Sequence, residues 1–137
     1  MYNRIDSAEQ LPEDEYLSAK EVLELYNRLV DQANELHRST LKAMDDLTEN
    51  QMLDPDELDV AVSESNRELS LRIANRERQM LNKIRKSINR INEGEYGTCD
   101  NCGVPIGYRR LLFRPVATMC IDCKTEQEQL EEGLWTL

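Results

Sequence analysis

Apolar residues recur every three or four positions over residues 18–50, the spacing that places side chains along one stripe of an α-helix. Ser18 followed by Glu21 forms a capping box, which predicts where this helix begins. The alternative is an amphipathic helix packed on a globular core, but no other apolar segment is long enough to form that core. The stripe alternates steps of four and three, as a coiled-coil seam does, through Val22, Tyr26, Leu29, Ala33, Leu36, Thr40, Ala43 and Leu47.

A second helix is predicted from Asp54 to about Ile91. Pro55 cannot continue an incoming helix, but it fits the first turn of a new one with Asp54 as N-cap. Gly94 and Gly97 are expected to end this helix. Two helices of more than 30 residues each predict an antiparallel hairpin about 50 Å long. The seam of the second helix is expected to run through Val62, Asn66, Leu69, Ile73, Arg76 or Glu77, Met80, Ile84, Ile88 and Ile91.

Charge is unevenly distributed along the chain, whose formal net charge is −10. Residues 1–60 contain 16 acidic and 5 basic residues, whereas residues 61–94 contain 4 acidic and 8 basic residues. An acidic protein is repelled by the phosphates of DNA, so duplex DNA is not the expected main partner. The opposite charges of the two predicted arms favour their pairing with each other.

The first sixteen residues lack the basic and apolar regions of a signal peptide. No apolar run in the chain approaches the roughly 18 residues that a membrane span needs. We therefore expect a cytoplasmic protein without a membrane contact, in a compartment where thiols remain reduced. Its four cysteines are then expected to bind a metal rather than to form disulfides.

The cysteines form two C-x2-C pairs separated by 17 residues, namely Cys99, Cys102, Cys120 and Cys123. Each pair can place two thiolates on one ion, and two pairs complete a tetrahedral zinc site. Four thiolates leave no open position for water or substrate, so the predicted zinc is structural. A redox dithiol is the less favoured alternative, because it needs only one pair and usually a βαβ setting.

The expected fold is all-α and consists of a long antiparallel helical hairpin, a small C4 zinc finger and a C-terminal helix. The predicted divisions are an N-terminal lead-in that forms part of the globular base over residues 1–17, a coiled-coil hairpin over 18–94 with its tip at 50–61, the finger over 95–124, and the C-terminal helix and tail over 125–137.

A four-cysteine finger can also bind nucleic acid. Fingers that contact DNA in this way rely on basic residues after the last cysteine pair. Here Lys124 is followed by the acidic segment 125–132, so sequence-specific DNA binding is not expected. A C4 nucleic-acid-binding protein is kept as an alternative function.

The hairpin, its tip and the finger together resemble the DksA/TraR family of transcription factors. The tip sequence DELDVA over residues 56–61 matches the family's D-x-x-D-x-A motif in full. The resemblance covers about residues 15–130 without an evident insertion. Further matching segments are NRER at 75–78, YGTC at 96–99, CGVPIG at 102–107, RRL at 109–111, RP at 114–115 and CIDCK at 120–124.

The resemblance implies a regulator that binds RNA polymerase through its secondary channel. The finger would lie at the channel entrance, and the tip residues Asp56, Asp59 and Ala61 would lie near the catalytic region. Family members of this kind act with ppGpp on transcription initiation, notably at ribosomal RNA promoters. We expect the chain to act as a monomer and not as an enzyme.

The resemblance also assigns roles to basic residues. Lys83, Arg114 and Lys124, with Met80 beside them, map onto the family's ppGpp-contacting surface, which is shared with the polymerase. Arg76 and Arg78 are candidates for polymerase contact, although ion pairs with the nearby acids of the same helix, Glu77 or Glu68, are the favoured role.

The two tip aspartates also allow an alternative, enzymatic function. They lie three residues apart, on one face of the first turn of the second helix. Paired carboxylates near a polymerase active site could hold Mg²⁺ and promote transcript cleavage, as Gre-type factors do. The DksA-type tip is not associated with cleavage, so this remains the alternative. Without the resemblance, the two acids would only complement the helix dipole.

Overall fold

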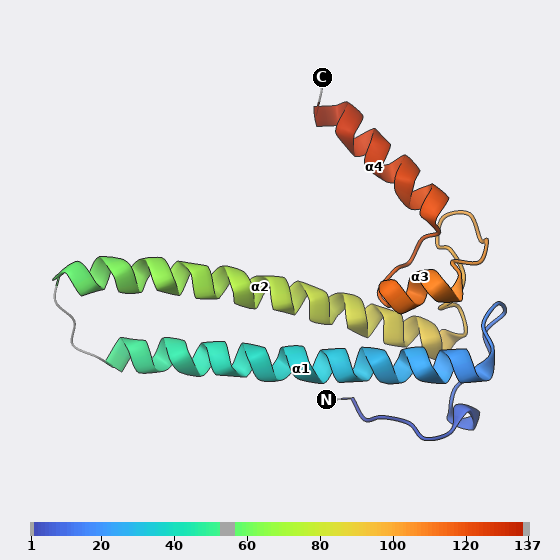
Figure 1. Cartoon of the computed structure of the whole chain (residues 1–137), viewed down its shortest axis with the longest axis horizontal. Helices are drawn as coiled ribbons and strands as arrows, with labels where there is room; N and C mark the ends of the chain where they lie inside the picture. The colour runs from blue at the N-terminus through green and yellow to red at the C-terminus, as the bar shows by residue number, and fades with distance from the viewer. Residues whose placement is uncertain (1, 53–56, 136–137) are drawn as a thin grey trace.

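The structure, a computed structural model, describes residues 2–52 and 57–135, and within them the side chains other than those of residues 43, 46–52, 57–63 and 135. Two long helices, α1 and α2, run antiparallel and side by side (Figure 1). At 34 and 37 residues, each is about 50 Å long. The elements are the 3₁₀ helix η1 (Ala8–Gln10), α1 (Ala19–Met52), α2 (Glu57–Glu93), α3 (Tyr108–Phe113) and α4 (Ile121–Trp135).

The predicted all-α fold class is confirmed. Within the described ranges, strand-like pairing is limited to one isolated bridge between Thr98 and Pro105. No helix in this part of the chain is long and apolar enough to cross a membrane. The last helix, α4, projects away from the hairpin (Figure 1), and its Leu130 and Leu134 side chains are exposed.

Helix α1 begins at the predicted capping box. The backbone N–H of Ser18 donates to Glu21 Oε1 at 2.9 Å, and the backbone N–H of Glu21 donates to Ser18 Oγ at 3.2 Å. These two bonds satisfy N–H groups that the first turn of a helix leaves without a partner. The predicted start of α2 at Asp54 and Pro55 lies outside the described residues.

Helix α2 ends at Glu93, and Gly94 terminates it as predicted. The backbone N–H of Gly94 donates to the carbonyl of Ile91 at 3.1 Å, and that of Glu95 donates to the carbonyl of Arg90 at 3.0 Å. This pair of bonds is the Schellman motif, which requires a left-handed residue after the helix. Gly94 has a φ of +77°, a conformation that glycine adopts without strain.

The hydrophobic core lies at the base of the hairpin and joins it to the finger. Side chains of both long helices pack there against Tyr96, Ile106 and Leu111 from the region after Gly94. Two helices alone cannot enclose a core, so the finger supplies the third layer. The buried helix residues in this core are Val22, Leu25, Tyr26, Leu29, Val30, Ala33, Ile84, Ile88 and Ile91.

Farther from the base, the predicted seam of α2 is wrong. Leu69 and Ile73 are 54% and 43% exposed, and Asn66 is also exposed, whereas Ala74 is 8% exposed. The seam therefore runs through Ala74, one position after the predicted Ile73, and then through Glu77, one of the two alternatives predicted for the next position. Near the base it follows the predicted isoleucines again.

Hydrogen bonds to Glu77 explain this displacement. Ser39 Oγ donates to Glu77 Oε1 at 2.9 Å, and Thr40 Oγ1 donates to Glu77 Oε2 at 2.6 Å. These bonds turn Glu77 toward α1, and the small Ala74 side chain follows it one turn earlier. A polar pairing inside a coiled-coil seam fixes the register of the two helices.

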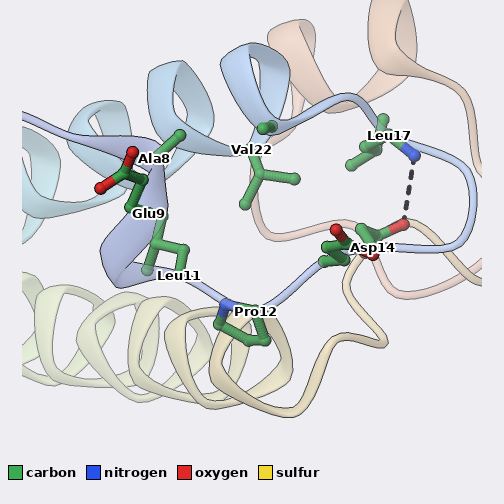
Figure 2. Close-up of a pocket in the computed structure, with 9 residues that line it drawn as sticks. Ala8, Glu9, Leu11, Pro12, Asp14, Leu17 and Val22 are labelled. Atoms are coloured by element: carbon green, nitrogen blue, oxygen red, sulfur yellow. Dashed lines mark hydrogen bonds between the residues drawn. The ribbon is translucent and has the colours of Figure 1, made fainter.

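The N-terminal segment lies along α1. Asn27 binds both polar groups of Ile5: its Nδ2 donates to the Ile5 carbonyl at 2.9 Å, and its Oδ1 accepts from the Ile5 N–H at 3.0 Å. Beyond η1 the chain turns back around a cavity of about 510 Å³ lined by Leu11, Pro12 and Asp14, among others. Figure 2 shows this cavity and the 3.3 Å hydrogen bond from the Leu17 N–H to Asp14 Oδ1 that closes the loop.

This loop also holds the segment that leads into the finger. The backbone N–H of Gly97 donates to Asp14 Oδ2 at 2.9 Å. A Cβ atom at Gly97 would lie 2.6 Å from Asp14 Oδ1 and 3.0 Å from Leu17 Cγ. The absence of a side chain at Gly97 therefore allows the loop to pack against the start of the finger.

Gly97→Ala is expected to destabilise the protein by about 1–3 kcal/mol, the usual cost of overpacking a tight contact. Chemical denaturation of the zinc-loaded protein would measure this change. Gly133→Ala is the matched control, because a Cβ atom at Gly133 in α4 meets nothing within 4 Å. Equal stability of Gly97→Ala and the wild type would contradict the packing argument.

Candidate metal centre and basic cavity

The four cysteine sulfurs form one compact cluster. All of them lie within 4.8 Å of one another, and the sulfurs of Cys102 and Cys120 are 3.7 Å apart. A tetrahedral zinc with Zn–S bonds of about 2.3 Å separates its sulfurs by about 3.8 Å. The cluster therefore has the size that one zinc ion needs, and the predicted four residues are brought together.

Local backbone structure positions the two pairs. The Cys99 N–H donates to the carbonyl of Val104 at 2.8 Å, and the Gly103 N–H donates back to the Cys99 carbonyl at 3.1 Å. Gly103 has a φ of +76°, so this tight turn favours glycine. The second pair lies at the start of α4, where the Lys124 N–H donates to the Cys120 carbonyl at 3.0 Å.

The surroundings of the sulfurs favour ionisation at one corner of the cluster. Burial raises the pKa of the Cys99 thiol, but backbone N–H groups that donate to its sulfur have the larger combined effect and lower the pKa to about 6. These N–H groups belong to Cys102, Cys120 and Asn101. A thiolate at Cys99 provides a first ligand for a metal cation.

At the opposite corner of the cluster, the Cys123 thiol resists ionisation unless a cation is bound. Asn101 Nδ2 donates to Cys123 Sγ at 3.4 Å and lowers the pKa of Cys123. The neighbouring thiols of Cys102 and Cys120 outweigh this bond and raise that pKa to about 12. Four thiolates repel one another unless a dication lies between them, and a bound zinc ion deprotonates its thiol ligands.

Arg90 connects this metal centre to the hairpin. Its side chain is only 12% exposed, forms an ion pair with Asp100 and donates to the carbonyls of Glu95, at 3.0 Å, and Thr98. Asp100 lies between the first two cysteines, so Arg90 fixes the knuckle to the last turn of α2. This role of Arg90 was not predicted, because nothing in the local sequence distinguishes Arg90 from the other cations of the helix.

A second site lies beside the finger, in a cavity of about 280 Å³. The cavity brings together three predicted residues, Lys83, Arg114 and Lys124. Lys86 and Arg110 also line it and were missed, although Lys86 lies three positions after Lys83 and therefore on the same helix face. Its remaining lining residues are Val116, Ala117, Thr118 and Met119, so none of the described residues that line it carries a carboxylate.

The electrostatics of this cavity favour an anion. Five cationic side chains repel one another across a small volume, and a polyanion relieves that repulsion. The two arginines can each donate two parallel hydrogen bonds to a phosphate, and the lysines add point charges.

The predicted residues on the stem do not join this cavity. Met80 and Arg76 line a separate groove, of about 360 Å³, that also contains Ile73. Arg78 is exposed. The favoured ion pairs of Arg76 and Arg78 with Glu77 or Glu68 are wrong: Glu68 lies 3.8 Å from Arg72, and the Glu77 carboxylate accepts the two hydroxyl hydrogen bonds from α1.

The predicted tip is only partly within the described chain. Asp56 lies outside the described residues. Asp59 and Ala61 belong to the first turns of α2, but their side chains are not described. The functional assignment of this tip therefore remains a prediction.

Comparison with known proteins relates this architecture to a family. Residues 22–91 match the N-terminal domain of the DnaK suppressor protein DksA, and residues 94–129 match the prokaryotic DksA/TraR C4-type zinc finger. The chain belongs to the DksA family. Together the two matches cover the hairpin base, both arms and the finger, and they identify the sulfur cluster as a C4 finger of the DksA/TraR type.

Named relatives support this membership. The RNA polymerase-binding transcription factor DksA of Escherichia coli is 32% identical over 130 residues, which cover 95% of this chain and 86% of the relative. The protein of the same name from Salmonella typhimurium is 35% identical over 135 residues, with the same two coverages. The resemblance to the family is therefore confirmed over nearly the whole chain.

Solved structures give the same result for the fold. The transcription factor DksA2 from Pseudomonas aeruginosa superimposes with a TM-score of 0.80 at 34% identity, over 88% of this chain and 93% of that one. A regulator from Chlamydia trachomatis, with a TM-score of 0.50 and 24% identity, shares the fold alone. The family match and the sulfur geometry both indicate a structural zinc site.

Proposed function

We propose that this protein binds RNA polymerase and regulates transcription initiation. The observation that carries the proposal is the family match across hairpin and finger together, with relatives named for polymerase binding and covered over 86% of their length. This role requires no catalytic residue in the chain itself, and it places the protein in the cytoplasm with the polymerase.

The proposed route of binding is the secondary channel of the polymerase. Two arms about 50 Å long form a narrow rod, and the core formed by the described side chains lies at its base. The rod would enter the channel as one monomer, with the finger at the entrance. The tip residues Asp56, Asp59 and Ala61 would then lie near the catalytic region. Arg76 and Arg78 are free of ion pairs among the described residues and are available to contact the channel wall.

Blocking the secondary channel is expected to abolish binding of the full-length chain to RNA polymerase. Fluorescence anisotropy with the labelled, zinc-loaded protein would measure the affinity with the channel open and closed. Binding of an initiation factor to another face of the same polymerase provides the control. An unchanged affinity with the channel blocked would contradict the proposed route.

The basic cavity is the proposed binding site for ppGpp. Its five cations match the two pyrophosphate groups of the nucleotide, and no carboxylate among its described lining residues would repel them. Met80 lies on the same helix one turn before Lys83 but outside the cavity, so it would contact the nucleotide only if the nucleotide extends beyond the cavity toward the groove of Met80 and Arg76. Since the site opens to the surface, the polymerase would complete it.

The double substitution Lys83→Glu/Arg114→Glu is expected to raise the ppGpp concentration for half-maximal regulation by at least about 100-fold. Each lost charge-assisted hydrogen bond costs about 1.5–3 kcal/mol, and every 1.4 kcal/mol is about tenfold. Transcription from a ribosomal RNA promoter, titrated with ppGpp, would measure this shift.

The control for this pair is Lys20→Glu/Lys42→Glu, which makes the same charge change at two exposed positions of α1. Neither of these lysines lines the cavity. An equal ppGpp response of the two double variants would argue against nucleotide binding in the cavity.

A further inference from the structure

One side chain of α3 is unusually exposed for its type. Phe113, the one phenylalanine of the chain, is 88% exposed. Leu111 is fully buried in the core, and two positions along a helix turn the side chain by about 200°. The last turn is closed by a 2.8 Å hydrogen bond from the Arg114 N–H to the Arg110 carbonyl. The helix geometry therefore holds Phe113 toward solvent.

Three arginines lie within four positions of Phe113 in the sequence. Arg109 precedes Phe113 by four residues, so both lie on the same outer face of the helix, and both are exposed. Arg110 and Arg114 lie on the side that borders the basic cavity. Residues 101–121 contain no acidic residue, although the whole chain has a formal net charge of −10.

These arginines also have no acidic partner within the part of the chain that the structure describes. The ion pairs found there join Arg4 to Asp31, Arg28 to Glu24, Arg72 to Glu68 and Arg90 to Asp100. A carboxylate does reach the start of α3, where Tyr108 donates to Glu24 Oε2 at 2.5 Å, but it forms no ion pair with these arginines. Arginine and aromatic side chains together are the residues that most often dominate binding energy at protein interfaces.

We propose that Arg109 and Phe113, here called the α3 face, anchor this protein to an acidic protein surface. The inference rests on the proposed function and assigns that surface to RNA polymerase, near the channel entrance. Phe113 would fill an apolar pocket rimmed by carboxylates that pair with Arg109. A protein surface suits this face better than a nucleic-acid duplex, because a protein can offer an apolar pocket for the exposed Phe113 ring beside its carboxylates.

The α3 face is distinct from the proposed nucleotide site. Neither Arg109 nor Phe113 lines the basic cavity, which contains Arg110 and Arg114 from the same segment. Changes to the α3 face should therefore alter polymerase affinity at every ppGpp concentration, including none. Changes inside the cavity should alter the response to ppGpp.

Binding of Phe113→Ala to purified RNA polymerase, without ppGpp, tests the inference. We expect the dissociation constant to rise at least about tenfold, as for other anchoring aromatics. Leu130→Ala is the matched control, because Leu130 is a comparably exposed apolar residue on α4. Arg109→Gln should weaken binding more at low salt than at high salt, because the screening of exposed charges increases with ionic strength.

The outcomes separate this inference from the proposed function. Weaker binding of Phe113→Ala, with Leu130→Ala unchanged and zinc content normal in both, supports the α3 face. Wild-type affinity of Phe113→Ala overturns it, while wild-type binding itself still supports the proposed function. An equal loss in both variants also overturns it, since any exposed apolar residue would then suffice. Failure of the wild-type chain to bind polymerase overturns both proposals.

Discussion

Cys120→Ser is expected to abolish zinc binding and to unfold the finger together with the base of the hairpin. A structural zinc contributes an apparent stabilisation of about 10–16 kcal/mol to small zinc domains, comparable with the whole stability of an ordinary domain. A serine hydroxyl does not replace a thiolate as a zinc ligand at neutral pH. Zinc stoichiometry and thermal unfolding followed by circular dichroism would measure the loss.

The loss should spread beyond the finger because the two parts share a core. Cys99, Cys120 and Cys123 are buried in the same cluster as the apolar residues of both long helices. Tyr96 also connects the two, since its hydroxyl donates to the carbonyl of Pro115 at 2.6 Å. Release of the finger would therefore expose the core residues that hold the arms together.

The control for this substitution is Asp122→Asn, which changes an exposed residue between the last two cysteines and leaves all four thiols in place. It should retain one zinc ion and the wild-type melting curve. Acidification should reproduce the effect of Cys120→Ser, because protons compete with zinc for the thiolates and zinc affinity falls as pH falls. A Cys120→Ser protein that keeps its zinc and its helicity would contradict the structural role of the site.

Asp59→Asn is expected to abolish the effect on promoters and to leave the affinity for RNA polymerase nearly unchanged. Asparagine has the size of aspartate but lacks its charge, so the substitution removes only what a carboxylate would do near the catalytic region. The lifetime of open promoter complexes, with and without the protein, would measure regulation. Direct binding of the variant to the polymerase would be measured beside it.

Asp45→Asn is the matched control for Asp59→Asn, because Asp45 is an exposed acid near the far end of α1. It should regulate as the wild type does. Wild-type regulation by Asp59→Asn would contradict the proposed tip. Efficient cleavage of transcript 3′ ends in stalled complexes by the wild-type protein would instead favour the Mg²⁺-dependent alternative.

Much of the fold is encoded in segments of a few residues. The capping box at Ser18 and the Schellman turn at Gly94 depend on hydrogen bonds between residues at most five positions apart, so both helix ends were predicted. The two cysteine pairs are equally local, since each knuckle is one turn of chain. Their spacing was enough to predict a four-sulfur site, and the family resemblance followed when this site was combined with the hairpin and the tip motif at residues 56–61.

Contacts between segments that are distant in the sequence could not be predicted from such local motifs. Apolar spacing favoured Ile73 for the seam, but the hydrogen bonds of Glu77 with α1 rotate the helix so that Ala74 is buried instead. The basic cavity and the role of Gly97 likewise depend on segments that meet only after folding. The role of Arg90 also depends on folding, since its ion-pair partner Asp100 lies in the finger.

The sequence by itself determined the helical hairpin, the ends of its helices and the four metal ligands, because each depends on neighbours along the chain. Only the tertiary structure decided which side of α2 faces α1, which cations gather beside the finger and which face of α3 is left exposed. These features depend on the rotation of whole helices about their axes. Packing contacts and hydrogen bonds across the whole fold together set that rotation. A local sequence pattern therefore cannot predict it.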